Sequence, residues 1–255
     1  MSHISFSELK IWNECPFKHK LMYIDKIKGF IGNEYTAFGG AIHSLCENAI
    51  VGEISEPDYD EFFQFAFRKE LKKIEVTKPD LVMDMLGQAQ NISPKIIPAV
   101  QQNFGNYEVF SVEERLFESI EDFTETEYNF KGFIDLVLRT PNGKYHIIDW
   151  KTCSWGWNRE RRSDTMTTYQ LTLYKKFFCQ KHNIDPSIVE THFALLKRTA
   201  KKDHVEIFRV TSGDRKTLNA NNLLLKAISN IHRQIKFKNR FSCGRCEFNK
   251  SEHCH

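Results

Sequence analysis

The chain has 255 residues, of which 41% are hydrophobic and 27% are charged. This composition excludes a wholly disordered chain and is sufficient for one large domain or two small ones with a buried core. No run of 18 uncharged apolar residues occurs, and the N-terminal segment lacks the apolar stretch of a secretion signal. We therefore expect a cytoplasmic protein that does not enter a membrane.

The charges are distributed unevenly along the chain. Residues 191–255 contain 14 Lys and Arg against 5 Asp and Glu, a net charge of +9, whereas the formal net charge of the whole chain is only +3. The first 190 residues therefore carry a net charge of −6. A basic C-terminal third suits a polyanionic partner, although a solvated basic surface is the alternative explanation.

The first hundred residues predict helices and give no strong strand signal. Ser5 and Glu8 form an S-x-x-E capping box, which predicts that a helix begins at this point. Further helices are expected near residues 38–51, 57–75 and 79–104, where Phe, Leu and Met are frequent.

The pattern then changes to strands. Three segments rich in apolar and β-branched residues, 108–118, 127–138 and 144–151, predict three strands. The turn sequence TPNG at residues 140–143 joins the second strand to the third. The sequence therefore predicts that these two strands form a hairpin.

The rest of the chain alternates between helices and strands. A helix is expected over residues 164–181, with Asp164 as its N-cap. Strands near 189–198 and 204–210 follow, and then a helix near 213–236. This order indicates an α/β fold.

Two carboxylates and a lysine stand out in the predicted hairpin. Asp149 and Lys151 end its second strand, and residues two apart on a strand point to the same face. Asp135 interrupts an apolar run of the first strand, where a carboxylate needs a partner or a metal. Two converging carboxylates suit a hard divalent cation such as magnesium, and a nearby lysine can stabilise developing negative charge. The alternative is a salt bridge between Asp149 and Lys151, with Asp135 capping a turn.

The seven cysteines form an odd-numbered set, and a disulfide framework is not expected. Cys243, Cys246 and Cys254 crowd the C-terminus with the spacing C-x2-C-x7-C. Thiolates with such spacing suit zinc or an iron–sulfur cluster. Cys15 is a candidate for the fourth ligand, and His253 and His255 are local substitutes.

Aromatic and basic residues lie together after the hairpin. The tryptophans Trp155 and Trp157 are followed by Arg159, Arg161 and Arg162. This combination suits a single-stranded nucleic acid, which offers bases for stacking and phosphates for ion pairs. The alternative is a solvated basic face beside half-buried tryptophans.

Four segments, in this order, resemble the PD-(D/E)XK nuclease superfamily, and within it the RecB-type branch that includes CRISPR-adaptation nucleases and phage exonucleases. They are FGGAIH at 38–43, GFID at 132–135, IDWK at 148–151 and YQLTLY at 169–174. The segments around Cys15 and Cys243 resemble the iron–sulfur segments of its cluster-bearing members. The resemblance implies a restriction-endonuclease-like α/β core at 106–212, preceded by an N-terminal helical segment (1–37) and the region of the histidine-bearing helix (38–105). A C-terminal helix and cysteine-rich tail (213–255) would follow.

The resemblance also implies roles for individual residues. His43, Asp135, Asp149 and the backbone carbonyl of Trp150 would hold magnesium or manganese, and Lys151 would be the catalytic lysine. Gln170 and Tyr174 would position the DNA strand or the lysine. A [4Fe–4S] cluster would be held by Cys15, Cys243, Cys246 and Cys254, with zinc as the alternative. The seven residues between Cys246 and Cys254 exceed the usual family spacing.

The function expected from this resemblance is a metal-dependent deoxyribonuclease. It would act as an exonuclease on single-stranded DNA ends in repair, recombination or CRISPR adaptation, and its oligomeric state is left open. One alternative is a nucleic-acid-binding module with an unused active site, and another is a zinc-stabilised interaction protein. The enzyme is favoured because paired carboxylates repel a phosphate backbone unless a metal ion compensates them.

Overall fold

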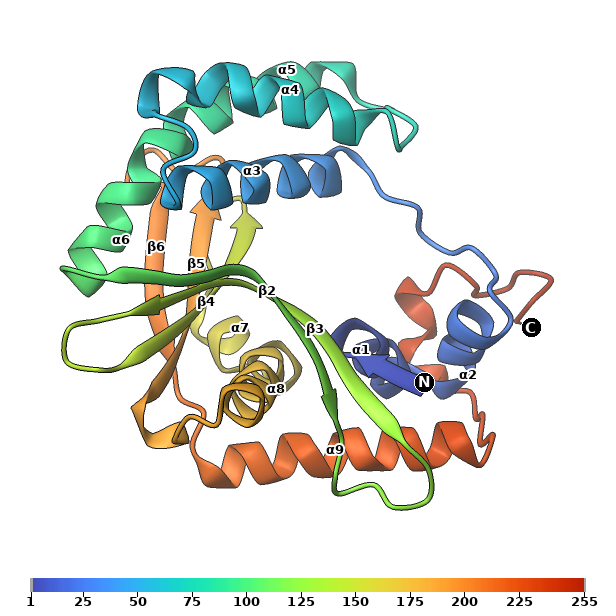
Figure 1. Cartoon of the computed structure of the whole chain (residues 1–255). Helices are drawn as coiled ribbons and strands as arrows, with labels where there is room; N and C mark the ends of the chain where they lie inside the picture. The colour runs from blue at the N-terminus through green and yellow to red at the C-terminus, as the bar shows by residue number, and fades with distance from the viewer. Residues whose placement is uncertain (1, 255) are drawn as a thin grey trace. The chain divides into compact units, whose positions relative to one another are not determined.

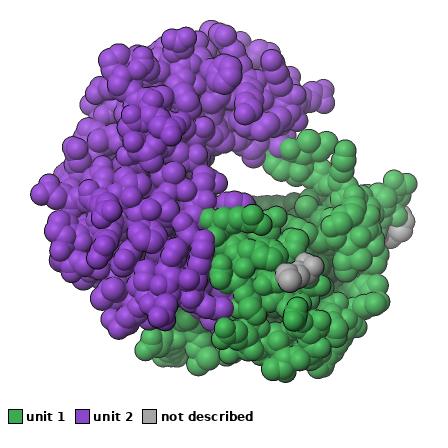
Figure 2. Space-filling view, viewed as in Figure 1, with its two compact units in different colours: residues 1–31, 115–132, 213–255 green, residues 32–114, 133–212 purple. Residues whose placement is uncertain are grey.

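The computed structural model of this protein describes residues 2–254. The chain forms two compact units, which Figure 2 distinguishes by colour. We name residues 32–114 and 133–212 the core unit, and residues 1–31, 115–132 and 213–255 the terminal unit. Strands β2 (Glu108–Ser119) and β3 (Tyr128–Arg139) pair with each other and contribute residues to both units.

The core unit is built on a mixed sheet. The C-terminal half of β3 pairs antiparallel with β4, β4 pairs parallel with β5, and β5 pairs antiparallel with β6. Their bounds are β4 (Tyr145–Cys153), β5 (Val189–Lys197) and β6 (Val205–Val210). Both β4 and β5 are almost entirely buried, as expected for parallel strands covered on both faces.

Helices α3 (Glu34–Ile50) and α6 (Ile96–Phe104) lie on one face of this sheet, and α4 (Tyr59–Leu71) and α5 (Pro79–Ile92) pack on α3 (Figure 1). Asn33 caps α3 through a capping box with Thr36. The apolar faces of the four helices form one core with Ile148 and Trp150 of β4 and with Ala194 and Leu196 of β5. Helix α3, which carries His43, is therefore anchored on the strands that carry the acidic residues.

Two helices follow β4 in the chain: the short α7 (Arg159–Ser163) and the long α8 (Thr165–His182). Asp164 caps α8 by accepting a hydrogen bond from the backbone N–H of Thr167 at 2.7 Å. Helix α8 lies on the face of the sheet opposite to α3 and contacts β4 and β5 (Figure 1). Its polar residues Gln170 and Tyr174 lie one turn apart and share a helix face.

The terminal unit combines both ends of the chain. A short strand β1 (Ser2–Ser5) pairs parallel with the start of β3, and α1 (Phe6–Glu14) contacts α9 (Asp214–His232). Helix α2 (Pro16–His19) and a π-helical turn (Lys20–Ile24) follow α1. After α9, a 3₁₀-helical segment (Arg240–Arg245) contains Cys243.

The predicted elements agree well with these bounds. Ser5 caps α1 as predicted, because its hydroxyl accepts a hydrogen bond from the Glu8 backbone N–H at 3.1 Å. The helix predicted over 79–104 is instead two helices, because Pro94 interrupts it within a 3₁₀ turn (Ser93–Lys95). Strand β1 and helix α7 carry no clear sequence signal and were not predicted. Within residues 2–254, no helix is long and apolar enough to cross a membrane.

Candidate active site

The candidate active site begins where β3 and β4 separate. Their paired register ends at Leu136 and Ile148. Just beyond this point, the backbone N–H of Trp150 on β4 donates a hydrogen bond to the side-chain Oδ2 of Asp135 on β3 at 2.7 Å. The carboxylate thereby fixes the end of the hairpin and is itself held in place. This explains how an apolar strand accommodates an acidic residue.

Asp149 is the most enclosed acid of the site, with 2% of its side chain exposed. Its Oδ2 lies 2.5 Å from Nζ of Lys151, and its Oδ1 accepts a hydrogen bond from Nε2 of Gln170 at 2.9 Å. Gln170 in turn donates to the hydroxyl of Tyr174 at 3.2 Å. The four side chains form one network, and the ion pair shows that Asp149 and Lys151 share a face of β4 as predicted.

His43 joins these residues from helix α3. Its Nδ1 lies 3.7 Å from Oδ2 of Asp135. Burial and the charge of Lys151 lower the pKa of His43 to about 4. The imidazole is therefore neutral at pH 7, which leaves a ring nitrogen available as a metal ligand.

Two further acids lie at this site. Glu47 follows His43 by one helical turn, and the sequence predicts that it orients this histidine. Sequence reasoning did not assign Glu113 to the site. Glu113 of β2 has a φ of 48°, in the left-handed region, although it is not a glycine. Such a residue within a strand is typical of a bulge that redirects a side chain, often at a functional site. The Glu113 carboxyl acts electrostatically on the carboxyl of Glu47 on α3. Burial and the charge of Glu113 raise the pKa of Glu47 to about 8.

The electrostatics of the site are dominated by buried acids. Burial raises the pKa of Asp135 and of Asp149 to about 6, even though Lys151 acts in the opposite direction on both. Glu113 adds to the shift of Asp135, and Asp135 adds to that of Asp149. The single lysine does not balance this number of carboxylates, so the site favours an additional cation.

The donor set fits a hard divalent cation. Magnesium and manganese prefer oxygen ligands, and magnesium is commonly bound through one or two carboxylates plus phosphate oxygens. Asp135 and Asp149 supply the carboxylates, and His43 supplies a neutral nitrogen. The Trp150 backbone lies in the same group, since its N–H donates a hydrogen bond to Asp135. All of these residues belong to the core unit.

The tryptophans and arginines predicted to bind nucleic acid divide into two groups. Trp155 is 67% exposed, and Arg159 and Arg161 are exposed on α7. By contrast, Trp157 is only 6% exposed and packs on Phe193, so its ring serves the core rather than base stacking.

Arg162 also has a structural role. Its guanidinium donates to the backbone carbonyl of Trp157 at 2.9 Å and pairs with Glu206 at 2.6 Å. Its charge is therefore already compensated within the protein. Trp155, Arg159 and Arg161 remain candidates for contact with a polyanion.

The cysteines predicted to share a metal lie together in the terminal unit. Four of them line one small pocket with the apolar side chains Phe17, Leu21 and Phe248; they are Cys15, Cys243, Cys246 and Cys254. The backbone N–H of Asn239 donates to Sγ of Cys15 at 3.3 Å. The structure thus brings together residues more than 200 positions apart. The substitute ligand His255 lies outside the described residues.

Comparisons with known proteins were made for the whole chain. A family model described as the PD-(D/E)XK nuclease superfamily matches residues 3–251. A crystal structure from Eubacterium rectale described as a "putative exonuclease" matches with a TM-score of 0.62 and 14% identity, covering 98% of this chain and 88% of that chain. The structure of SSO0001 matches with a TM-score of 0.40 and 15% identity, covering 95% and 92%. No curated protein matches. The family match confirms the predicted restriction-endonuclease-like α/β core.

Proposed function

The chain belongs to the PD-(D/E)XK nuclease superfamily, and we propose that it hydrolyses phosphodiester bonds at the ends of single-stranded DNA with a divalent metal ion. The observation that carries this proposal is the convergence of His43, Asp135, Asp149 and Lys151 on one point of the core unit. A phosphate-binding module has no use for such an excess of buried carboxylates, because they repel the DNA backbone.

The residues present suggest how the reaction is supported. His43, Asp135, Asp149 and the Trp150 carbonyl would hold magnesium or manganese, which when bound polarises the phosphate and activates a water molecule. Lys151 is placed to orient the attacking water or to stabilise the charge that develops on the phosphate. Gln170 fixes Asp149, and Tyr174 fixes Gln170, so α8 keeps the carboxylate in position.

Two observations support the preference for single-stranded ends. Trp155 offers an exposed ring for base stacking, and Arg159 and Arg161 lie exposed on the following helix. The structural relative from Eubacterium rectale is itself described as a "putative exonuclease". We extend this proposal to a role in repair, recombination or CRISPR adaptation, as the RecB-type resemblance implies.

We further propose that Cys15, Cys243, Cys246 and Cys254 hold a [4Fe–4S] cluster. A tetrahedral zinc ion would bring its sulfur ligands to about 3.8 Å from one another, given a Zn–S distance near 2.3 Å. Among the described residues, no three of these sulfurs lie within 4.8 Å of one another. Each iron of a cluster binds a different thiolate, so a cluster suits this wider spacing better.

The cluster proposal is tested by analysis of anaerobically purified protein. We expect about four iron and four sulfide per chain together with visible absorbance, and Cys243→Ala should lose both and lower the melting temperature. Cys179→Ala is the control, because that thiol is buried in α8 of the core unit and does not line the pocket. Stoichiometric zinc without sulfide would replace the cluster with a zinc site.

The nuclease proposal is tested by cleavage of end-labelled single-stranded DNA with magnesium or manganese. The wild type should release a ladder of products whose order reports the polarity, whereas Lys151→Ala should be at least about a hundredfold slower. Lys10→Ala is the matched control, because Glu8 and Lys10 repeat the acid-x-Lys spacing on a helix and Lys10 is exposed.

Each outcome of the cleavage experiment decides between two functions. Cleavage by the wild type and Lys10→Ala, but not by Lys151→Ala, supports the proposed enzyme. Equal cleavage by all three proteins would mean that Lys151 has no catalytic role. If none of them cuts but all bind the strand, the protein is a nucleic-acid-binding module, and the acidic cluster serves only the fold.

A further inference from the structure

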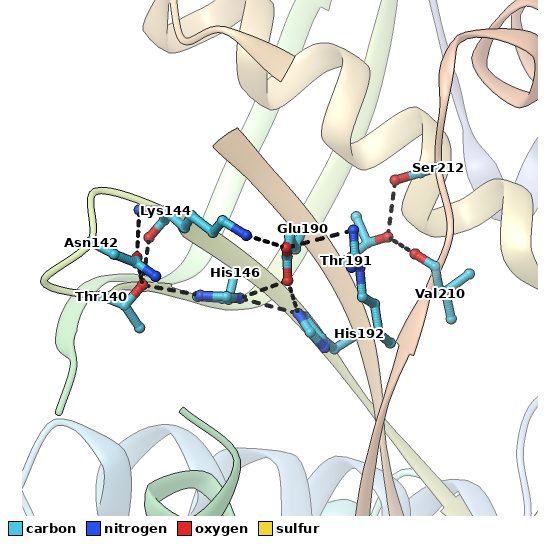
Figure 3. Close-up of polar contacts among 10 residues, drawn as sticks. Thr140, Asn142, Lys144, His146, Glu190, Thr191, His192, Val210 and Ser212 are labelled. Carbon is cyan, nitrogen blue, oxygen red and sulfur yellow. Dashed lines mark hydrogen bonds and ion pairs between the residues drawn. The ribbon is translucent and has the colours of Figure 1, made fainter. Parts of the chain in front are cut away.

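A second cluster of ionisable residues lies at the opposite end of strand β4. His146 of β4 and the β5 residues Glu190 and His192 point toward one another, as Figure 3 shows. In the parallel pairing of the strands, His146 is the partner of Glu190, and His192 lies two residues further along β5. Both imidazoles contact the ring of Phe104 at the end of α6. The cluster therefore lies on the face of the sheet covered by α3 and α6.

The three side chains have the geometry of a metal site. Nδ1 of His146 lies 3.2 Å from Nε2 of His192, and Oε2 of Glu190 lies 3.8 Å from the first nitrogen and 3.9 Å from the second. A triangle with these sides has a centre about 2.1 Å from each corner. This value equals the usual distances from zinc to imidazole nitrogen and carboxylate oxygen.

The two carboxylate oxygens of Glu190 have different partners. Oε1 accepts a hydrogen bond from Lys144 at 2.8 Å and lies 3.5 Å from the guanidinium of Arg209, which leaves Oε2 facing the imidazoles. Nε2 of His146 lies 3.2 Å from the hydroxyl of Thr140. Ligating carboxylates and histidines are typically held by outer hydrogen bonds of this kind.

We propose that His146, Glu190 and His192 bind one divalent transition metal ion, with zinc as the best fit. Two imidazoles and one carboxylate form the ligand set of open zinc sites, in which a further position is left for water or an anion. A pocket of about 500 Å³ adjoins His146 and Glu190, and its lining includes Asn103, Asn142 and Lys144. The open position would face these polar groups.

This site is separate from the candidate active site. His146 and Asp149 lie three residues apart on β4, about 10 Å along the strand, and point to opposite faces of the sheet. The nitrogen-rich set favours zinc, whereas the carboxylate-rich set around Asp149 favours magnesium or manganese. Bound zinc would join β4 to β5 next to the turn at residues 140–144 and so stabilise that end of the sheet.

The proposal is tested by titrating chelator-treated protein with cobalt, a spectroscopic substitute for zinc, in the presence of excess magnesium. We expect the wild type to bind one more equivalent of cobalt than the double variant His146→Gln/His192→Gln. The difference spectrum should contain d–d bands without a thiolate charge-transfer band, which separates this site from the cysteines. His204→Gln is the matched control, because the His204 imidazole contacts the backbone carbonyl of Lys197 and does not belong to the cluster.

A second variant keeps the test decisive if the double variant fails to fold. Glu190→Gln preserves the size of the side chain and should weaken cobalt and zinc binding at least tenfold while His204→Gln leaves it unchanged. Zinc at a concentration near the wild-type Kd should raise the melting temperature of the wild type more than that of Glu190→Gln. Equal metal stoichiometry in the wild type and the double variant, or equal affinity in Glu190→Gln, would overturn the proposal.

Discussion

Strand β4 carries two groups of ionisable side chains, and their charge balance differs. Around Asp149, buried acids outnumber the single cation Lys151, and burial raises the pKa of both Asp135 and Asp149 to about 6. Around Glu190, burial acts in the same direction, but the hydrogen bond from Lys144 and the charge of Arg209 lower the pKa of that carboxyl overall. The first group is short of positive charge without a metal ion, and the second is not.

This difference in charge balance indicates different roles for the two ends of the strand. A site that stores uncompensated negative charge lowers the stability of the metal-free fold and binds a hard divalent cation strongly. A site whose carboxylate is already paired contributes to stability by itself, and a metal adds to it. The predictions below test this contrast, beginning with the largest effect.

Asp149→Asn should have opposite effects on activity and on stability. Cleavage should fall by about 10³-fold or more, because the amide is a poor ligand for the metal that the reaction needs. The free energy of unfolding of the metal-free protein should rise by about 1–3 kcal/mol at pH 7, because a buried acid with a raised pKa destabilises the fold once it is ionised. Cleavage assays and thermal melts measure both effects.

The gain in stability expected for Asp149→Asn should depend on pH, and this dependence is a control for its cause. The advantage of Asp149→Asn over the wild type should vanish below about pH 4, where Asp149 is protonated in both the folded and the unfolded state. Asp214→Asn repeats the substitution in another acid-x-Lys pair, on the exposed first turn of α9, and should change neither property. A lower melting temperature for Asp149→Asn at pH 7 would mean that its ion pair with Lys151 stabilises the fold.

The pH profile of cleavage should fall on the acidic side below about pH 6. Asp135 and Asp149 both have pKa values raised to about 6 by burial, and their protonated forms do not hold a cation. The rate at limiting metal should drop up to a hundredfold per pH unit if both protons matter, and tenfold if one does. Raising the manganese concentration should move the midpoint to lower pH, whereas a midpoint independent of metal would assign the titration to another group.

Glu113 connects the acidic site to β2, and two substitutions separate its side chain from its backbone. Glu113→Gln should lower cleavage by about 10- to 100-fold through weaker metal binding, with little change in stability. Glu113→Gly should lower cleavage similarly and yet stabilise the metal-free protein, because glycine adopts a φ of 48° without strain. Full activity in both variants would exclude Glu113 from the site.

Local sequence patterns predicted most of the fold. The N-cap at Ser5, the N-cap at Asp164 and the TPNG turn before β4 each act through neighbouring residues, so the sequence alone reveals them. The convergence of Asp135, Asp149 and Lys151 was predicted because strand alternation and hairpin pairing fix which side chains meet. Strand β1 was missed because its four residues pair with β3, more than 120 positions away.

The remaining site residues could not be predicted for the same reason. Glu113 lies in an ordinary strand pattern, and only its left-handed backbone marks it as unusual. His146 and His192 are 46 residues apart, and only the register of β4 against β5 brings them together. Trp157 and Trp155 look equivalent in the sequence, but packing against Phe193 buries the first and leaves the second exposed.

The two tryptophans provide the smallest and most specific of these tests. Trp155→Ala should weaken the binding of single-stranded DNA by about 1–3 kcal/mol, or roughly 5- to 150-fold, without changing the melting temperature, since its exposed ring is free to stack on a base. Trp155→Phe should retain most of the affinity because it keeps an aromatic face. Trp157→Ala should instead lower the melting temperature, because it leaves a cavity beside Phe193. Binding that is unchanged in Trp155→Ala would place the DNA on a different surface, and fluorescence anisotropy in calcium, with cleavage suppressed, measures all three variants.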